Sequence, residues 1–198
     1  MNGYEKRTQE KKLRVLEATF NMMNTDEGIE NVTIDEIAKH SNVGKTSIFK
    51  YFGSKENLIH EVFKNFIDTM LDNAAKIMTQ NKPFEETLIA LTQSKINSLD
   101  RINKRFYLDL MDYYTQEGDD GLSLIMQKYI KESSDLMMDL FHIGRKEGKV
   151  DLKYSDEFLM LYLQAIVEGI SNPHIYSKIL PYTAEWAELL MKGIAPNK

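Results

Sequence analysis

The stretch Thr33–Leu58, TIDEIAKHSNVGKTSIFKYFGSKENL, decides the fold of this chain. Thr33 is a good helix cap, and Glu36 stands three residues later, as in a capping box. Asn42 is the expected turn residue, because asparagine tolerates a left-handed backbone better than most residues. Gly44 can then start a second short helix. Two short helices joined by a tight turn form a helix-turn-helix, a motif that reads DNA.

The second helix of this motif exposes cations and hydroxyl groups, which suit phosphates and base edges. Ser54 can cap a third helix, at whose N-terminus Lys55 can reach a phosphate. The predicted DNA contacts are Thr33, Lys45, Thr46, Ser47, Lys50, Tyr51 and Lys55. The alternatives are that Lys50 and Lys55 are solvated lysines without a partner, and that Tyr51 packs against the first helix.

These residues resemble the TetR family of bacterial one-component regulators. The resemblance begins at Val15–Met23 and is strongest in Val43–Phe52 and Ser54–Leu58, so that it covers roughly the first third of the chain. It implies an N-terminal three-helix DNA-binding domain followed by a helical domain that binds an effector and forms a dimer. We expect residues 1–54 to form the first domain and residues 55–198 the second.

The chain departs from the usual family pattern at Asn42, Gly44, Thr46 and Phe49. Thr46 adds a side chain where relatives have glycine, which can change the DNA sequence that is read. Phe49 lacks the tyrosine hydroxyl that often touches phosphate in relatives, so Phe49 is left out of the predicted contacts.

The charge of the chain is unevenly distributed. The 198 residues carry a net charge of −5, but residues 1–64 sum to zero and residues 65–198 hold the whole deficit. Basic side chains gather in Tyr4–Arg14, and local charge governs contact with phosphate. The chain has no cysteine, no apolar signal segment and no run of membrane-spanning length. We therefore expect a cytoplasmic protein with no membrane association.

Apolar residues recur at helical spacing along the whole chain, and no alternating strand pattern occurs. In the first helix, one face is lined by Leu13, Leu16, Phe20 and Met23. Further helices are predicted over 54–80, 84–99, 102–115, 121–145, 155–171 and 183–194. The sequence thus predicts an all-α fold.

The helix over 155–171 is apolar nearly all round, so it must be covered on two sides. One explanation is that it runs through the middle of a single-chain bundle. The other is a homodimer interface shared with the last helix, which the resemblance favours. The predicted interface residues are Leu159, Leu163, Val167, Trp186 and Leu190. A dimer would present two recognition helices to successive major grooves of a palindromic site.

The middle helices are rich in aromatic residues and methionine, which can enclose an apolar ligand. The alternative is an ordinary packed core, and it is the resemblance that favours a small-molecule effector. The predicted effector residues are Phe106, Met111, Tyr113, Tyr114, Met137, Phe141 and Gln164.

An enzyme is not expected. The four histidines are scattered, and no metal-binding, nucleophile or phosphate-loop motif is present, so no catalytic residue, metal or cofactor is predicted. The function implied by the resemblance is a repressor of transcription that binds double-stranded DNA as a homodimer and is released by a small effector. Two alternatives remain: an architectural or partner-coupled DNA-binding protein without effector, and a carrier that has lost specific DNA binding.

Overall fold

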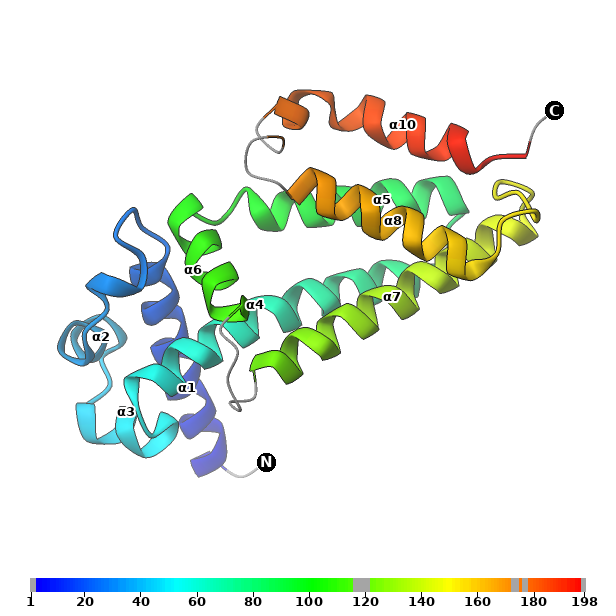
Figure 1. Ribbon diagram of the computed structural model, residues 1–198. Helices are drawn as coiled ribbons and strands as arrows, with labels where there is room; N and C mark the ends of the chain where they lie inside the picture. Colours follow the sequence, from blue (N-terminus) through cyan, green and yellow to red (C-terminus); the bar gives the residue numbers. More distant parts are fainter. Residues whose placement is uncertain (1–2, 116–121, 172–174, 176–177, 197–198) are drawn as a thin grey trace. The chain divides into compact units, whose positions relative to one another are not determined.

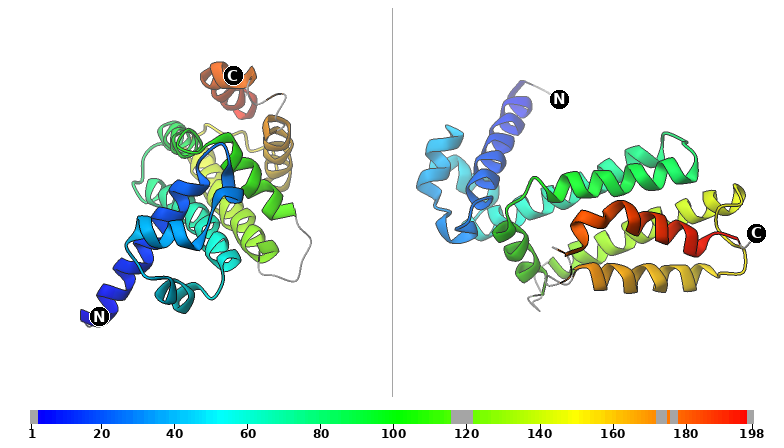
Figure 2. Two further views of the ribbon diagram at one scale, coloured as in Figure 1. Left: turned by 90° about the vertical axis from the view of Figure 1, so that its left-hand side faces the viewer. Right: turned by 90° about the horizontal axis from the view of Figure 1, so that it is seen from above.

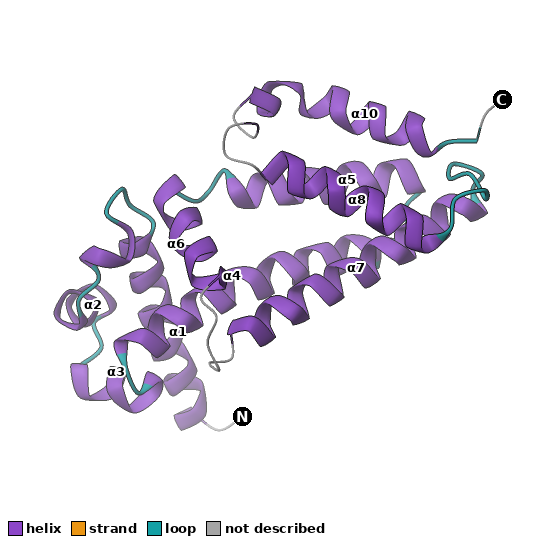
Figure 3. Cartoon of the chain, in the orientation of Figure 1, coloured by secondary structure: helices purple, strands orange, loops and turns teal. Residues whose placement is uncertain are grey.

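The structure, a computed structural model, describes residues 3–115, 122–171, 175 and 178–196. All regular secondary structure in this part of the chain is helical (Figure 3). The predicted all-α fold is confirmed.

The α-helices are shown in Figure 1. They are α1 (Gly3–Met23), α2 (Ile34–Ser41), α3 (Lys45–Phe52), α4 (Lys55–Met78), α5 (Phe84–Leu99), α6 (Lys104–Thr115), α7 (Leu122–Lys146), α8 (Asp156–Ser171) and α10 (Thr183–Ile194). Short 3₁₀ helices are η1 (Gly28–Asn31) and η2 (Leu180–Tyr182). The predicted bounds of α5 and α10 are reproduced. Helix α8 begins one residue later than predicted, because the Ser155 hydroxyl caps it by accepting the Phe158 amide at 3.1 Å.

By its internal contacts the chain divides into two compact units. The first consists of Met1–Met70 and Ile96–Tyr129, and the second of Leu71–Lys95 and Ile130–Lys198. The first unit therefore contains α1, α2 and α3 together with α6 and the first part of α4.

An aromatic cluster forms the centre of the first unit. Phe106 of α6 is fully buried, and its ring meets Phe20 of α1 at 5.2 Å between centroids. Phe63 and Phe66 of α4 lie 5.3 and 5.5 Å from the same ring, all in edge-on arrangements. The cluster packs α6 against both α1 and α4. Figure 2 draws the ribbon from two further sides.

The buried residues of α1 are only partly those of its apolar face. They are Val15, Ala18, Thr19 and Met23, whereas Leu13 is 60% exposed. Leu13 lines the open groove between α1, α3 and α4 instead of the core.

The second unit has its own apolar core. Its buried members are Phe84, Leu88, Leu140, Phe141, Val150, Leu159 and Ile194. Gly144 of α7 lets the chain close over this core, because a Cβ there would lie 2.6 Å from Val150 and 2.8 Å from the ring of Phe84. Helices α5, α7, α8 and α10 all contribute to the cluster.

Candidate DNA-binding surface

Helix α2 and the turn after it follow the local signals in the sequence. The Thr33 hydroxyl accepts the backbone amide of Glu36 at 3.3 Å, so Thr33 caps α2 as predicted. Asn42 ends the helix with φ 52° and ψ 43°, the left-handed conformation expected of the turn residue. Val32 and Ile37 are fully buried and fix the start of α2. The helix-turn-helix geometry is therefore set by caps and by two apolar anchors.

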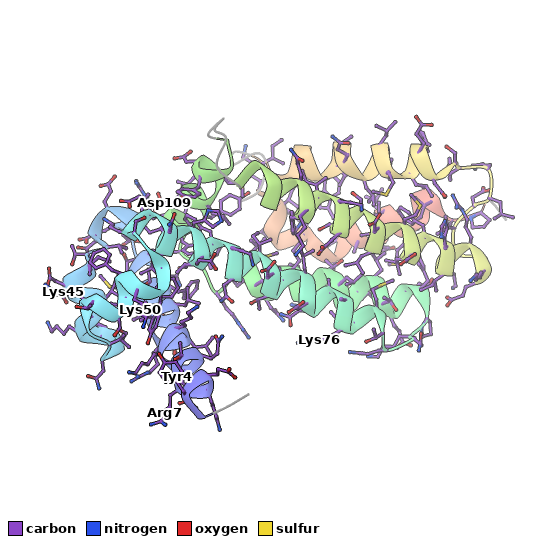
Figure 4. All side chains as sticks on the ribbon, turned by 90° about the horizontal axis from the view of Figure 1, so that it is seen from below. Tyr4, Arg7, Lys45, Lys50, Lys76 and Asp109 are labelled. Atoms are coloured by element: carbon purple, nitrogen blue, oxygen red, sulfur yellow. The ribbon has the colours of Figure 1, made fainter. Side chains whose placement is uncertain are left out.

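Helix α3 turns one face inward and one outward. Ile48 is buried on the inner side, and Val43 just before the helix is buried as well. Lys45, Thr46, Phe49 and Lys50 are exposed, and their spacing places them on one outward face. Figure 4 labels Lys45 and Lys50 on this helix. The outward face therefore offers two ammonium groups, a hydroxyl and an aromatic ring.

The two cations of α3 differ in their surroundings. The Lys45 ammonium forms an ion pair with Asp35 of α2, so part of its charge is already neutralised. Lys50 has no ion-pair partner among the residues that the structure describes, and it is exposed. Lys50 is therefore the better placed of the two for a phosphate.

The start of α4 is partly occupied by the protein's own groups. The Ser54 hydroxyl accepts the Asn57 amide at 3.1 Å. The pKa of Glu56 is lowered, first by a backbone hydrogen bond in this first turn and then by the Ser54 side chain. A phosphate that binds Lys55 would share the N-terminus of α4 with the Glu56 carboxylate.

Tyr51 lies where α3 meets α1. Its half-buried ring has the Lys12 ammonium 5.9 Å from its centroid. Both residues line a groove of about 500 Å³ bounded by α1, α3 and α4. Tyr51 thus has one side against the first helix, which is the alternative that its sequence position left open. The pairing with Lys12 gave no signal in the sequence.

Phe49 is a surface feature that reasoning from the sequence left aside. Its ring is 48% exposed on the same face as Lys45 and Thr46. The thymine methyl is the apolar group that base edges present in the major groove, and phenylalanine suits it. The signal was present in the sequence, since an aromatic residue three positions after Thr46 must share its face in a helix.

The predicted effector residues are divided between the two units. Phe106, Met111 and Tyr113 belong to the first unit, and the ring of Phe106 is enclosed by the aromatic cluster. Met137, Phe141 and Gln164 belong to the second, where Phe141 is buried in the core and Gln164 is exposed. The side chain of Tyr114 lies outside what the structure describes.

The predicted dimer residues also fall into different environments. Leu159 is fully buried in the core of its own unit, and Leu163 packs against that core. Trp186 is exposed, Leu190 is half-buried, and the side chain of Val167 lies outside the described part of the chain.

Other apolar side chains face outward on the same two helices. Leu161 of α8 is 59% exposed and Leu189 of α10 is 68% exposed, while Phe158 is half exposed. Helices α8 and α10 therefore each carry exposed apolar side chains, Phe158 and Leu161 on α8 and Trp186 and Leu189 on α10.

The helix-turn-helix region matches a known family. Residues 15–62 match the family described as bacterial regulatory proteins, tetR family. The match begins in α1, spans α2 and α3, and ends in the first turns of α4.

Known relatives extend the comparison beyond this region. The uncharacterised HTH-type transcriptional regulator YhgD of Bacillus subtilis is 34% identical over 79 residues, which cover 40% of this chain and 41% of the relative. An HTH-type transcriptional regulator of Staphylococcus aureus is 20% identical over 181 residues, covering 81% of this chain and 97% of that protein.

The fold is shared with solved regulators over nearly the whole chain. The structure of FadR from Bacillus subtilis in complex with stearoyl-CoA superposes with a TM-score of 0.67 at 14% identity, and the superposition covers 92% of this chain and 98% of that one. Among the described helices, none has the length and apolar character to cross a membrane. The matched residues 15–62 show a helix-turn-helix of the TetR family of bacterial transcriptional regulators, and the solved regulators show a shared all-helical fold.

Proposed function

We propose that this regulator is a homodimeric repressor that binds a palindromic operator and releases it when a small apolar or aromatic effector binds. The observation that carries the proposal is the outward face of α3, with Lys45, Thr46 and Lys50 exposed above the buried Ile48. A helix anchored on one side and polar on the other can enter a major groove without loss of its own packing.

Within the major groove of DNA, each polar residue of α3 has a role that follows from its chemistry. Lys45 and Thr46, in the first turn, face base edges or adjacent phosphates. Lys50, which is free of an ion pair among the described residues, neutralises a phosphate, and Ser47 and Tyr51 add hydroxyl contacts. Thr33 at the start of α2 and Lys55 at the start of α4 contact the phosphate backbone of the DNA.

The exposed apolar side chains of α8 and α10 support a dimer. Leu161 and Leu189 are each more than half exposed, and burial of a leucine side chain contributes about 1.5–3 kcal/mol. A copy of the same two helices across a two-fold axis would cover both residues. The dimer would then present its two α3 helices to half-sites about 34 Å apart, or a multiple of that.

Support for the effector comes from composition and from the fold. Met137 packs against the core of the second unit, to which Phe141 belongs, and methionine adapts its shape to an apolar ligand. The solved FadR holds stearoyl-CoA, a ligand with a long apolar chain. Effector binding lowers DNA affinity only by its preference for the conformation that does not bind DNA, and a coupling of about 1–3 kcal/mol changes affinity about 5–150-fold.

The test is selection of random duplex DNA by the purified full-length protein near physiological salt, with sedimentation to give the oligomeric state. A recovered palindrome and a dimer are the expected results. Salt-sensitive binding without any preferred sequence would contradict the proposal and favour an architectural role. A library of fatty acids and aromatic compounds, added to the operator complex, then tests the effector: no release at saturation would remove that class of ligand.

A further inference from the structure

Asp109 is a buried carboxylate that no DNA or effector contact explains. It lies on α6, is 4% exposed, and is labelled in Figure 4. Its Oδ2 accepts the backbone amide of Ile29 at 2.9 Å, and its Oδ1 accepts Nε of Arg105 at 2.8 Å. Arg105 also donates to Glu30 at 3.0 Å. A charged group held on both oxygens joins α6 to the short η1 helix between α1 and α2.

The backbone of η1 is shaped to receive this carboxylate. Gly28 has φ +60°, and a Cβ at that position would lie 2.1 Å from Oδ2 of Asp109 and 2.6 Å from Cγ of Arg105. The carboxylate therefore fills the space that any side chain at position 28 would need. Glycine is required here both by the conformation and by the contact.

A second set of hydrogen bonds fixes the beginning of the same connection. Asn24, just after α1, donates to the carbonyl of Arg101 at 2.9 Å and accepts the amide of Asn103. The Asn103 side chain donates to Asp26 at 2.8 Å. The segment from 101 to 109 thus holds the α1–α2 connection at both of its ends.

The placement of this connection bears directly on the DNA-binding surface. Ile29 stands just before Val32 and Thr33, which are the buried anchor and the cap of α2. Residues 101–109 lie outside the matched region 15–62, yet they belong to the same compact unit. We propose that α6 contributes to DNA recognition by supporting the helix-turn-helix, and that Asp109 is the positioning residue that fixes α2 and α3 for specific DNA recognition.

This inference rests on the proposed function, and its test uses the full-length protein. Asp109→Asn keeps the size of the side chain but replaces one acceptor with a donor, which must then face either the Ile29 amide or Arg105. The matched control is Asp139→Asn, the same change at an exposed carboxylate of α7. Circular dichroism identifies a temperature at which both variants are folded, and DNA binding is measured there.

The readout is the ratio of affinity for the selected operator to affinity for unrelated DNA. We expect Asp109→Asn to lower operator affinity about tenfold. When the α1–α2 connection is no longer held by α6, the helix-turn-helix is in its DNA-binding conformation for a smaller fraction of the time. Affinity for unrelated DNA and its salt dependence stay unchanged, since the phosphate-binding cations remain. The control is expected to match the wild type in every measurement.

Loss of thermal stability alone does not support the inference. An unchanged affinity ratio in a folded Asp109→Asn protein would overturn it, whatever the melting temperature. If that variant does not fold, Arg105→Lys at the half-exposed edge of the network replaces it, and the same fall in ratio is expected to a smaller extent. Failure of the wild type to select any operator would instead overturn the proposed function, and this inference with it.

Discussion

Replacement of Gly28 by alanine tests how strongly α6 fixes η1, the short helix that precedes the helix-turn-helix. The added methyl group meets two obstacles, the left-handed backbone and the Asp109 carboxylate 2.1 Å away. The carboxylate cannot move away freely, because Asp109 is 4% exposed and accepts hydrogen bonds on both oxygens.

The expected cost has two parts. An alanine in the left-handed region costs about 1–2 kcal/mol. Displacement of the carboxylate breaks its charge-assisted hydrogen bond to the Ile29 amide, a further loss of about 1.5–3 kcal/mol. We therefore expect the free energy of unfolding to fall by about 2.5–5 kcal/mol, against a typical total of about 5–15 kcal/mol.

The assay is urea unfolding followed by far-ultraviolet circular dichroism, with Gly148→Ala as the control. Gly148 has φ +68°, close to that of Gly28, and a Cβ there meets no atom within 4 Å. The control carries the backbone cost without the buried clash and should lose about 1–2 kcal/mol. Equal losses in the two variants would refute the claim that Asp109 clamps η1.

The other predictions concern DNA contacts, assembly and pH. Lys50→Ala weakens operator binding and lowers the salt slope by about one, as measured by titration at several salt concentrations. Replacing operator thymines by uracil weakens wild-type binding about fourfold for each methyl that contacts Phe49, the equivalent of about 0.8 kcal/mol, and Phe49→Ala loses this sensitivity. Leu161→Glu gives a folded monomer in sedimentation, since the residue is exposed within one subunit. The pKa of Asp156 is held below its ordinary value, first by the Arg145 side chain and then by His142. Its ionised form therefore stabilises the fold at pH values above the ordinary pKa, the contribution is lost as pH falls through the lowered pKa, and Asp156→Asn shows a weaker acid dependence of unfolding.

The features that the sequence predicts well are those decided by neighbouring residues. The cap at Thr33, the left-handed turn at Asn42 and the bounds of α5 depend on side chains within a few positions, and all are found in the structure. The outward face of α3 follows in the same way, from helical spacing and the buried Ile48.

Features that depend on distant segments were missed or misplaced. Leu13 fits the apolar period of α1, but it is exposed because α3 and α4 leave a groove at that point. Leu159 and Leu161 are both apolar positions of α8, and only tertiary packing decides that the first is core and the second is surface. Periodicity identifies a buried face, but it does not say which neighbour covers it.

The contact between Asp109 and Ile29 joins residues separated by 80 positions, and no local pattern announces it. Its two halves were nevertheless visible as separate peculiarities: a glycine in the α1–α2 connection and an acidic residue on an otherwise apolar stretch of α6. A buried carboxylate is costly unless it is fully paired, so its partners are constrained more strongly than ordinary surface residues. Residues 101–109 lie outside the region that matches the family model, but their sequence is still constrained. They must fit the backbone of the connection that leads into the helix-turn-helix. That constraint separates residues 101–109 from the apolar interior of the second unit, where side chains of similar volume can replace one another at lower cost.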